Sequence, residues 1–262
     1  MYEHHQNALD NLVKLLKPDP TILAIVTAGS IAQGKAREGS DVDVYIVVTD
    51  DSFKERQQQH QLAYTNHDVC DYPDGYIDGK IINQRFLELA ALQGSEPTRY
   101  SFLGSTAVYS QISDLDDLLQ TISTYPEQNR EQNLIDFYSQ IYLYAFYFAG
   151  EAAKKDNPYL LSHSVSNLVL FSGRAILAIN RQLFPCHKGL MDAVQDASNK
   201  PENFIQMAND LLSAPNYEKC MDLAKVMLGF HDPGISFEQA VSLFVSNNEW
   251  NWIDHEPPLA DR

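Results

Sequence analysis

Two aspartates, Asp41 and Asp43, stand at the start of the apolar run Val42 to Val48 and are the residues best suited to chemistry. Successive side chains of a strand point to opposite faces, so these two carboxylates share one face of the predicted strand. Carboxylates a strand step apart suit a hard divalent cation such as Mg²⁺, which completes its octahedron with phosphate oxygens and water. The pair therefore predicts a metal site that also binds phosphate.

A Gly-Ser turn, Gly29 and Ser30, follows a second apolar run, Ile22 to Val26, and precedes the two aspartates. Glycine lets the backbone approach a phosphate closely. Serine can cap a short helix whose N–H groups point at the same anion. Together with the aspartates, this turn predicts a site for a metal ion and a nucleoside triphosphate.

This arrangement resembles the nucleotidyltransferase superfamily of DNA polymerase β-like folds, whose signature is Gly-Ser, a spacer of about ten residues, and Asp-x-Asp on a strand. Here residues 31–40 separate Ser30 from Asp41, and Ser40 directly precedes the first aspartate. The resemblance implies that the two aspartates bind Mg²⁺, as one or two ions. It also implies that Gly29, Ser30 and Ser40 bind the co-substrate, ATP or another nucleoside triphosphate.

The superfamily places a third carboxylate on the strand beside the Asp-x-Asp strand, and Asp78 resembles it best. Asp78 is embedded in a strand predicted over Tyr76 to Ile82, whereas Asp71 and Asp74 flank a proline and fit a turn. A third carboxylate could accept the proton of the attacking hydroxyl, or it could hold a second metal ion. Two metal ions about 4 Å apart would bind both the attacking and the leaving oxygen. A strand-end position beside Gly79 is the alternative for Asp78.

Basic residues that could neutralise triphosphate charge occur in two places. Lys80 has the same strand parity as Asp78 and could reach the triphosphate as a point charge, or could be a surface residue. The segment from Arg174 to Lys188 is similar to a pattern, Leu-Asn-Arg-x-x-Phe-Pro-x-x-Lys, in the helical half of some antibiotic-nucleotidyltransferase-like proteins. Arg174, Arg181 and Lys188 would then face the departing pyrophosphate, or form salt bridges to the acidic surface.

The formal net charge of −16, from 19 Lys and Arg against 35 Asp and Glu, disfavours a polynucleotide substrate, because nucleic-acid binders need a basic footprint. Such a field attracts a cationic small substrate, although an acidic surface also serves solubility alone. The scattered cysteines Cys70, Cys186 and Cys220 fit reduced thiols in a cytoplasmic protein. We expect no export signal and no membrane partner, since no apolar run nears the roughly 20 residues of a membrane span.

The order of predicted elements gives an α+β fold in two parts. Residues 1–125 fit a small mixed β-sheet domain flanked by helices, the catalytic part. Its strands are predicted at residues 21–27, 42–48, 76–82 and 107–110, and its helices at residues 2–17, 84–93 and 114–124. Asp114 is the expected cap of the last helix, and the polar residues 52–67 fit a solvated helix or loop. A polar, proline-containing stretch, residues 125–133, marks the domain boundary.

Residues 131–262 lack strand signals and predict an all-α helical bundle. The aromatic-rich residues 134–155 should form a helix buried between neighbours, because their aromatic side chains cover more than one helical face. A second long helix, residues 159–184, ends before Pro185. Shorter helices are predicted at residues 188–197, 201–213, 217–228 and 236–247.

This two-part layout looks like that of the antibiotic nucleotidyltransferases acting on aminoglycosides or lincosamides. The resemblance implies transfer of AMP from ATP to a hydroxyl of a small, hydroxylated, cationic acceptor such as an aminoglycoside-like antibiotic. The catalytic base of those enzymes is often a glutamate, so Glu88 and Glu151 stand as candidates besides Asp78. Two other functions stay open: modification of a protein or RNA, as in toxin–antitoxin systems, and a non-catalytic nucleotide-binding module. The sequence leaves the acceptor, the preferred nucleotide and a homodimeric state open.

Overall fold

The computed structural model describes residues 1–254 and 256–262, and its internal contacts divide the chain into two compact units. The N-terminal unit comprises Met1–Tyr125 and the C-terminal unit comprises Pro126–Arg262. Each unit has its own buried apolar clusters, so each is described by itself.

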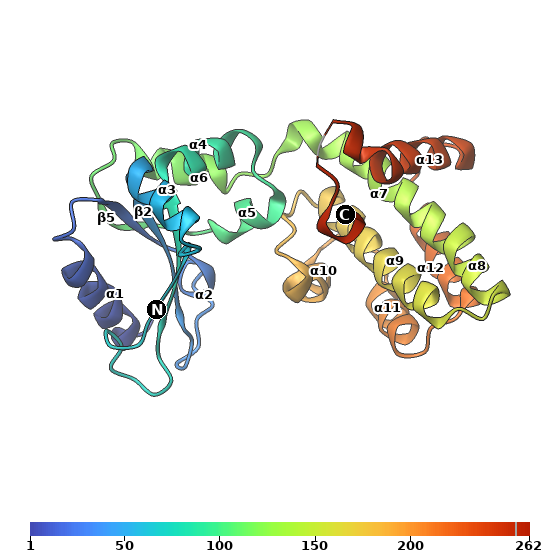
Figure 1. Ribbon diagram of the computed structural model, residues 1–262. Coiled ribbons are helices and arrows are strands. Elements are labelled where there is room, and N and C mark those ends of the chain that lie inside the picture. Colours follow the sequence, from blue (N-terminus) through green and yellow to red (C-terminus); the bar gives the residue numbers. More distant parts are fainter. Residues whose placement is uncertain (255) are drawn as a thin grey trace. The chain divides into compact units, whose positions relative to one another are not determined.

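The N-terminal unit, coloured blue to green in Figure 1, is built on one five-stranded sheet. The strand order of this sheet is β3-β4-β2-β1-β5. The strands are β1 (Ile22–Thr27), β2 (Val42–Val48), β3 (Ala63–Asn66), β4 (Ile77–Asn83) and β5 (Ala107–Ser110). β2 and β4 run parallel, and the other neighbouring pairs are antiparallel. Strands β2 and β4 are therefore joined by a crossover, which contains a helix and the edge strand β3.

Helices pack on both faces of this sheet. They are α1 (Glu3–Leu16), α2 (Gly29–Ala32), α3 (Asp50–Gln58), α4 (Gln84–Gln93), α5 (Glu96–Ser101) and α6 (Leu115–Ile122). Alternation along β2 explains the two layers, because Val44 and Ile46 join a buried cluster with Leu9 of α1. Tyr45, on the other face, joins a cluster with Leu119 of α6. Asp43 is two positions before Tyr45, so its side chain lies on the same face of the sheet as Tyr45, the face on which α4 and α6 pack.

Three local features of this unit differ from the sequence predictions. Strand β3 lies within residues 52–67, which were expected to form a solvated helix or loop. It is a short edge strand whose side chains alternate between exposed and half-buried, so its sequence is polar and carries little strand signal. Helix α5 was not predicted, although Ser95 provides a cap by accepting a hydrogen bond from the Thr98 N–H at 3.4 Å. Asp114 does precede α6, but with φ 56° it is left-handed and its side chain caps nothing. Asp114 therefore occupies the predicted N-cap position without making the side-chain hydrogen bond expected of it.

The regular elements in the described residues of the C-terminal unit are all helices, so the predicted α+β class with a helical second half is confirmed. The α-helices are α7 (Arg130–Tyr142), α8 (Ala149–Lys154), α9 (Pro158–Ile179), α10 (Leu190–Asp196), α11 (Phe204–Ser213), α12 (Tyr217–Phe230) and α13 (Phe237–Phe244). Two π-helical segments interrupt this pattern: η2 (Leu143–Phe148) joins α7 to α8, and η4 (Val245–Glu249) extends α13. The core of the unit includes Tyr138, whose hydroxyl donates to the Met227 carbonyl at 2.9 Å and ties α7 to α12.

Helix α9 ends five residues earlier than predicted, and Asn180 supplies the reason. Its amide group donates to the carbonyls of Ile176 and Asn199, and its Oδ1 accepts from the Asn199 N–H. The next residue, Arg181, has φ 54°, a left-handed conformation that ends the helix. By length and composition α9 could cross a membrane, but half of its apolar window is buried inside the unit, as in a core helix.

Arg99 holds the ends of two helices in the N-terminal unit, and its loss should destabilise the fold. Arg99 is 3% exposed. Its guanidinium donates to two carbonyls at the end of α4, those of Ala91 and Gly94. It also donates to three carbonyls at the end of α6, those of Thr121, Ile122 and Thr124. Buried carbonyls left without donors are costly, so Arg99→Met should lower the free energy of unfolding by roughly 3 kcal/mol. Urea denaturation measures this change.

Arg85, exposed on α4, provides the matched control. Arg85→Met should leave the urea midpoint within experimental error of the parent protein, since surface substitutions away from such contacts have small effects. Equal destabilisation by the two substitutions would contradict the role of Arg99 as a shared helix cap.

Candidate active site

The three predicted carboxylates converge on one face of the N-terminal sheet. One ligand oxygen from each of Asp41, Asp43 and Asp78 lies within 4.8 Å of the other two. Asp41 and Asp43 are half-buried and Asp78 is exposed, so the cluster opens to solvent on one side. Three hard oxygen donors at this spacing fit a divalent cation such as Mg²⁺, which binds a few carboxylates and shares its remaining positions with phosphate and water.

Strand register explains why an aspartate far along the chain joins the other two. β2 and β4 pair in parallel, and in this register Asp43 is the direct partner of Asp78. Side chains of directly paired residues lie on the same face of a sheet. Asp41 stands one residue before β2, two positions from Asp43, and therefore also points to this face. The cluster is thus a property of the β2–β4 pairing.

The Gly-Ser turn lies directly against the second aspartate. A Cβ placed on Gly29 would overlap the Asp43 carboxylate and stand 2.6 Å from its Cγ, and Gly29 has φ +59°. Only glycine satisfies both conditions without strain. The backbone N–H of Ala28 also donates to the Asp43 carbonyl at 2.9 Å, so the turn and the strand are held together.

The role expected for Ser30 as a helix cap was wrong. Helix α2 begins at Gly29, its N-cap is Ala28, and no side chain accepts a capping hydrogen bond. Ser30 is therefore the second residue of the helix, in the first turn, where backbone N–H groups have no intrahelical partner. Its half-buried side chain and these N–H groups remain the groups that could meet a phosphate.

Two tyrosines hold the segment that leads into the first aspartate. The Tyr76 hydroxyl donates to Asp41 Oδ2 at 3.1 Å, and the Tyr72 hydroxyl donates to the Ser40 carbonyl at 2.8 Å. The hydrogen bond to Asp41, together with the charges of the three carboxylates, raises the pKa of Tyr76. Burial first, and then the nearby Cys70 and Asp41, raise the pKa of Tyr72 to about 12. Both phenols therefore stay protonated donors at neutral pH.

Removal of the Tyr76 hydroxyl should weaken metal–nucleotide binding. A donor behind a ligating carboxylate fixes its orientation, and loss of such a donor commonly lowers metal affinity about 10-fold or more. We expect Tyr76→Phe to raise the dissociation constant for Mg²⁺ with α,β-methylene-ATP by about 10-fold in a calorimetric titration. Tyr72→Phe is the matched control, because it removes a bond to a backbone carbonyl rather than to a carboxylate. A larger loss in Tyr72→Phe than in Tyr76→Phe would overturn this assignment.

The other predicted nucleotide-binding residues of the N-terminal unit lie close to this face. Ser40 precedes Asp41, and its Oγ accepts a hydrogen bond from the Arg37 N–H at 2.9 Å. Lys80 is the direct strand partner of Tyr45, and its Nζ lies 5.8 Å from the centroid of that ring. Lys80 is exposed and shares the sheet face of Asp78, as its parity predicts. Its contact with triphosphate stays a prediction.

The basic residues of the segment Arg174 to Lys188 belong to the C-terminal unit, and two of them have partners there. The Arg174 guanidinium lies between the rings of Phe137 and Phe184, 4.6 and 4.5 Å from their centroids. Arg181 forms a two-bond ion pair with Glu127, at 2.8 and 3.0 Å. The salt-bridge alternative therefore holds for Arg181. Lys188 is exposed in a short 3₁₀ turn, and its role at the phosphates stays a prediction.

The two glutamates considered as alternative catalytic bases, Glu88 and Glu151, are not part of the carboxylate cluster found among the described residues. The Glu151 carboxylate forms ion pairs with the Nζ atoms of Lys154 and Lys155, at 3.0 and 3.1 Å, and these contacts lower its pKa. Glu88 is exposed on α4 and accepts a hydrogen bond from Gln84.

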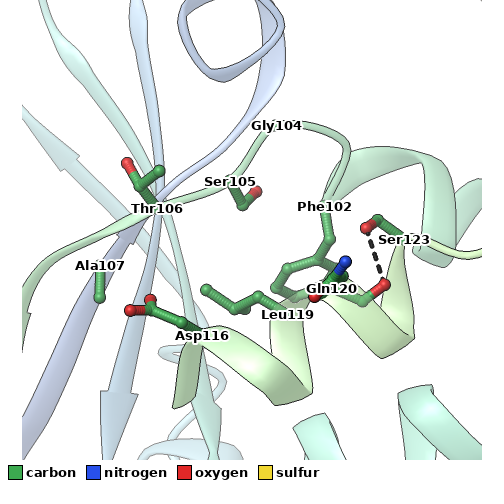
Figure 2. A pocket seen from close by; sticks show the side chains of 9 residues that line it. All are labelled: Phe102, Gly104, Ser105, Thr106, Ala107, Asp116, Leu119, Gln120 and Ser123. Carbon is green, nitrogen blue, oxygen red and sulfur yellow. Dashed lines mark hydrogen bonds between the residues drawn. The ribbon is translucent and has the colours of Figure 1, made fainter. Parts of the chain in front are cut away.

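A separate pocket of about 380 Å³ lies beside the start of β5 (Figure 2). Phe102, residues 104–107 and the side of α6 that carries Asp116 and Leu119 line it. Its wall is tied to the end of β1, because the Thr27 N–H donates to the Thr106 carbonyl at 2.9 Å. None of the three carboxylates is among the described residues that line it, so the metal site and this pocket are distinct.

Comparison with known proteins agrees with the carboxylate site. Residues 10–89 match the family model described as "Polymerase beta, Nucleotidyltransferase", a span that contains β1, β2 and β4 with all three aspartates. This segment is a polymerase β-like nucleotidyltransferase domain.

A solved structure that the chain resembles is a nucleotidyltransferase-like protein from Exiguobacterium sibiricum 255-15, with 12% identity and a TM-score of 0.49. That likeness covers 95% of this chain and 78% of the other. No curated protein sequence matches the chain.

Proposed function

We propose that the protein transfers a nucleoside monophosphate, AMP from ATP, to a hydroxyl of a small hydroxylated and cationic molecule. The observation that carries the proposal is the convergence of Asp41, Asp43 and Asp78 within 4.8 Å, inside the segment that matches the nucleotidyltransferase model. Phosphoryl transfer asks little covalent chemistry of a protein and depends on positioning and charge neutralisation. A carboxylate cluster beside a glycine turn offers both.

The residues divide the work as follows. Asp41 and Asp43 hold Mg²⁺, which neutralises charge on the phosphates when it is bound. Asp78 accepts the proton of the acceptor hydroxyl, because it is the exposed member of the cluster and so the one that an acceptor can reach. The acceptor oxygen forms a bond to the α-phosphorus, the bond between that phosphorus and the bridging oxygen breaks, and pyrophosphate leaves with the electron pair. Gly29, Ser30, Ser40 and Lys80 contact the phosphates, and a phosphate contact of Lys188 is proposed from the sequence resemblance alone.

The acceptor class rests on charge. A net charge of −16 repels polynucleotides and attracts cations, which favours an amine-bearing polyol such as an aminoglycoside-like antibiotic. The cytoplasm, where ATP is available, is the proposed location. Assembly as a homodimer is also proposed, and the nucleotide preference is measured by the screen that follows.

A pyrophosphate-release screen tests this function. Each of the four nucleoside triphosphates is incubated with Mg²⁺ and a panel of amino sugars, antibiotics and neutral sugars. We expect release with ATP and a hydroxylated amine, and none with EDTA. Labelled nucleotide appearing only in protein or RNA of a cell lysate would favour the macromolecular alternative. Calorimetric binding of Mg²⁺ and nucleotide without turnover on any acceptor would favour a regulatory module.

A further inference from the structure

The C-terminal unit contains a polar pocket of about 500 Å³ that the proposed chemistry does not use. Residues of α7, of α9 and of the π-helical segment η4 with the turn after it line this pocket. They include Asp136, Gln140, Phe171, Asn247, Trp250 and Asn251. Its volume falls in the range of small-molecule sites, and π-helical segments occur frequently at functional sites.

Gln140 is the first sign that the pocket takes a ligand with hydroxyl groups. Gln140 is 4% exposed, and its Oε1 is buried with no hydrogen-bond partner among the described residues. A buried amide oxygen without a partner is costly, and native proteins rarely leave one so. Because Gln140 lines the pocket, a turn of its side chain toward the pocket would give the amide oxygen a ligand hydroxyl as partner, and a hydroxyl both donates and accepts.

The charge of the pocket favours a cation. Asp136 and Asp254 contribute carboxylates, and none of the described residues that line the pocket is Lys, Arg or His. Asp136 is held in place, since its Oδ1 accepts hydrogen bonds from Asn247 at 2.9 Å and from Gln132 at 3.1 Å. A half-buried carboxylate fixed in this way can form a charge-assisted hydrogen bond to an ammonium group.

Aromatic side chains complete the chemistry. Trp250 is 57% exposed and Phe171 is half-buried, so both offer ring surface to a ligand. Aromatic faces pack against the apolar side of a saturated ring and attract a nearby cation. Carboxylates, amides and aromatic rings around one pocket are the groups that recognise a hydroxylated amine.

We propose that this pocket binds an amino sugar, that is, a ring carrying both hydroxyl and ammonium groups. The inference goes beyond the proposed function, because the carboxylates that carry nucleotidyl transfer all belong to the other unit. Ligand ammonium contacts Asp136, ligand hydroxyls contact Gln140 and the asparagines, and a sugar ring packs on Trp250.

The test is a calorimetric titration of the full chain without metal or nucleotide. The probe is the disaccharide of glucosamine, and cellobiose is its matched neutral control, with hydroxyl groups in place of the ammonium groups. We expect the glucosamine disaccharide to bind at least about 10-fold more tightly, the gain of one charge-assisted hydrogen bond. Putrescine, a cation without rings or hydroxyls, should bind no better than cellobiose.

Two pairs of variants locate the site. Asp136→Asn keeps the acceptor oxygen and removes the charge, so it should abolish the preference over cellobiose. Asp222→Asn, at an exposed side chain of α12, should not. Trp250→Ala should weaken binding about 10-fold, whereas Trp252→Ala, at an equally exposed tryptophan (58%), should leave it unchanged. Equal binding of the two disaccharides, or equal effects of the paired variants, would overturn the proposal. Since no nucleotide is present, these outcomes are independent of whether nucleotidyl transfer is found.

Discussion

Replacement of Asp43 by asparagine is expected to lower metal-dependent nucleotidyl transfer by roughly 10³-fold or more, with the fold intact. Asp43 is the carboxylate on which the site converges, because it pairs with Asp78 across the strands and lies against Gly29. Asparagine keeps the size of the side chain and one oxygen. The substitution therefore removes a negative charge from the ligand set and changes little else.

Thermal denaturation separates this effect from a loss of structure. In the metal-free protein three carboxylates within 4.8 Å repel one another, so Asp43→Asn should keep or raise Tm. Mg²⁺ with α,β-methylene-ATP should raise the Tm of the parent protein, since a ligand that binds only the folded state stabilises it, but not that of the variant. Asp51→Asn, on the exposed first turn of α3, should respond like the parent. Full turnover in Asp43→Asn would remove the metal role from this residue.

The local part of the site could be predicted because strand geometry is local. Asp41 and Asp43 share a face whatever the rest of the chain does, since the alternation of side chains follows from the extended backbone alone. The apolar run that follows them defined β2 with the boundaries that the structure shows. The same reasoning put Asp78 and Lys80 on one face of their own strand.

The non-local part could not be read from the residues. That Asp43 meets Asp78 depends on the register between β2 and β4, and a slip of one residue would turn Asp78 to the other face. Only the family resemblance suggested this pairing. The hydrogen bond of Tyr76 to Asp41 also depends on the pairing of β2 with β4, so the sequence did not predict it. The position of Tyr76, two residues before Asp78, was the one sign that its hydroxyl could reach the carboxylates.

The helical unit shows how tertiary contacts override local preference. Arg181 and the residues after it are compatible with a helix, yet α9 ends at Ile179 because the Asn180 amide is bonded to the backbone of Asn199. Arg181 then turns out to pair with Glu127. The apolar periodicity of the sequence does not indicate the contact of Asn180 with Asn199 or that of Arg181 with Glu127. For this reason the sequence predicted that the helix exists but not the residue at which it ends.

Gly29 offers the sharpest test of the link between the turn and the metal site, because Gly34 provides a control for backbone strain. Both glycines are left-handed, with φ +59° and +70°, so an alanine at either position should cost roughly 1 kcal/mol of stability. Only at Gly29 does the added methyl group meet the Asp43 carboxylate, whereas nothing lies within 4 Å of one at Gly34. The carboxylate must then move by a distance on the order of 1 Å, a displacement that can cost about 10²-fold in a catalytic site.

Gly29→Ala should therefore lose at least about 10²-fold in turnover and in affinity for Mg²⁺ with α,β-methylene-ATP, while Gly34→Ala keeps both. Urea denaturation should show a loss of stability in both variants, larger in Gly29→Ala because its methyl group also meets Asp43. Turnover and affinity are therefore compared under conditions in which both variants are folded. If both variants lost metal binding equally, backbone strain in residues 29–34 would be the cause. If neither did, Asp43 would tolerate displacement, and the glycine would serve the turn alone. The predicted split arises only if the glycine leaves room for the carboxylate that binds the metal.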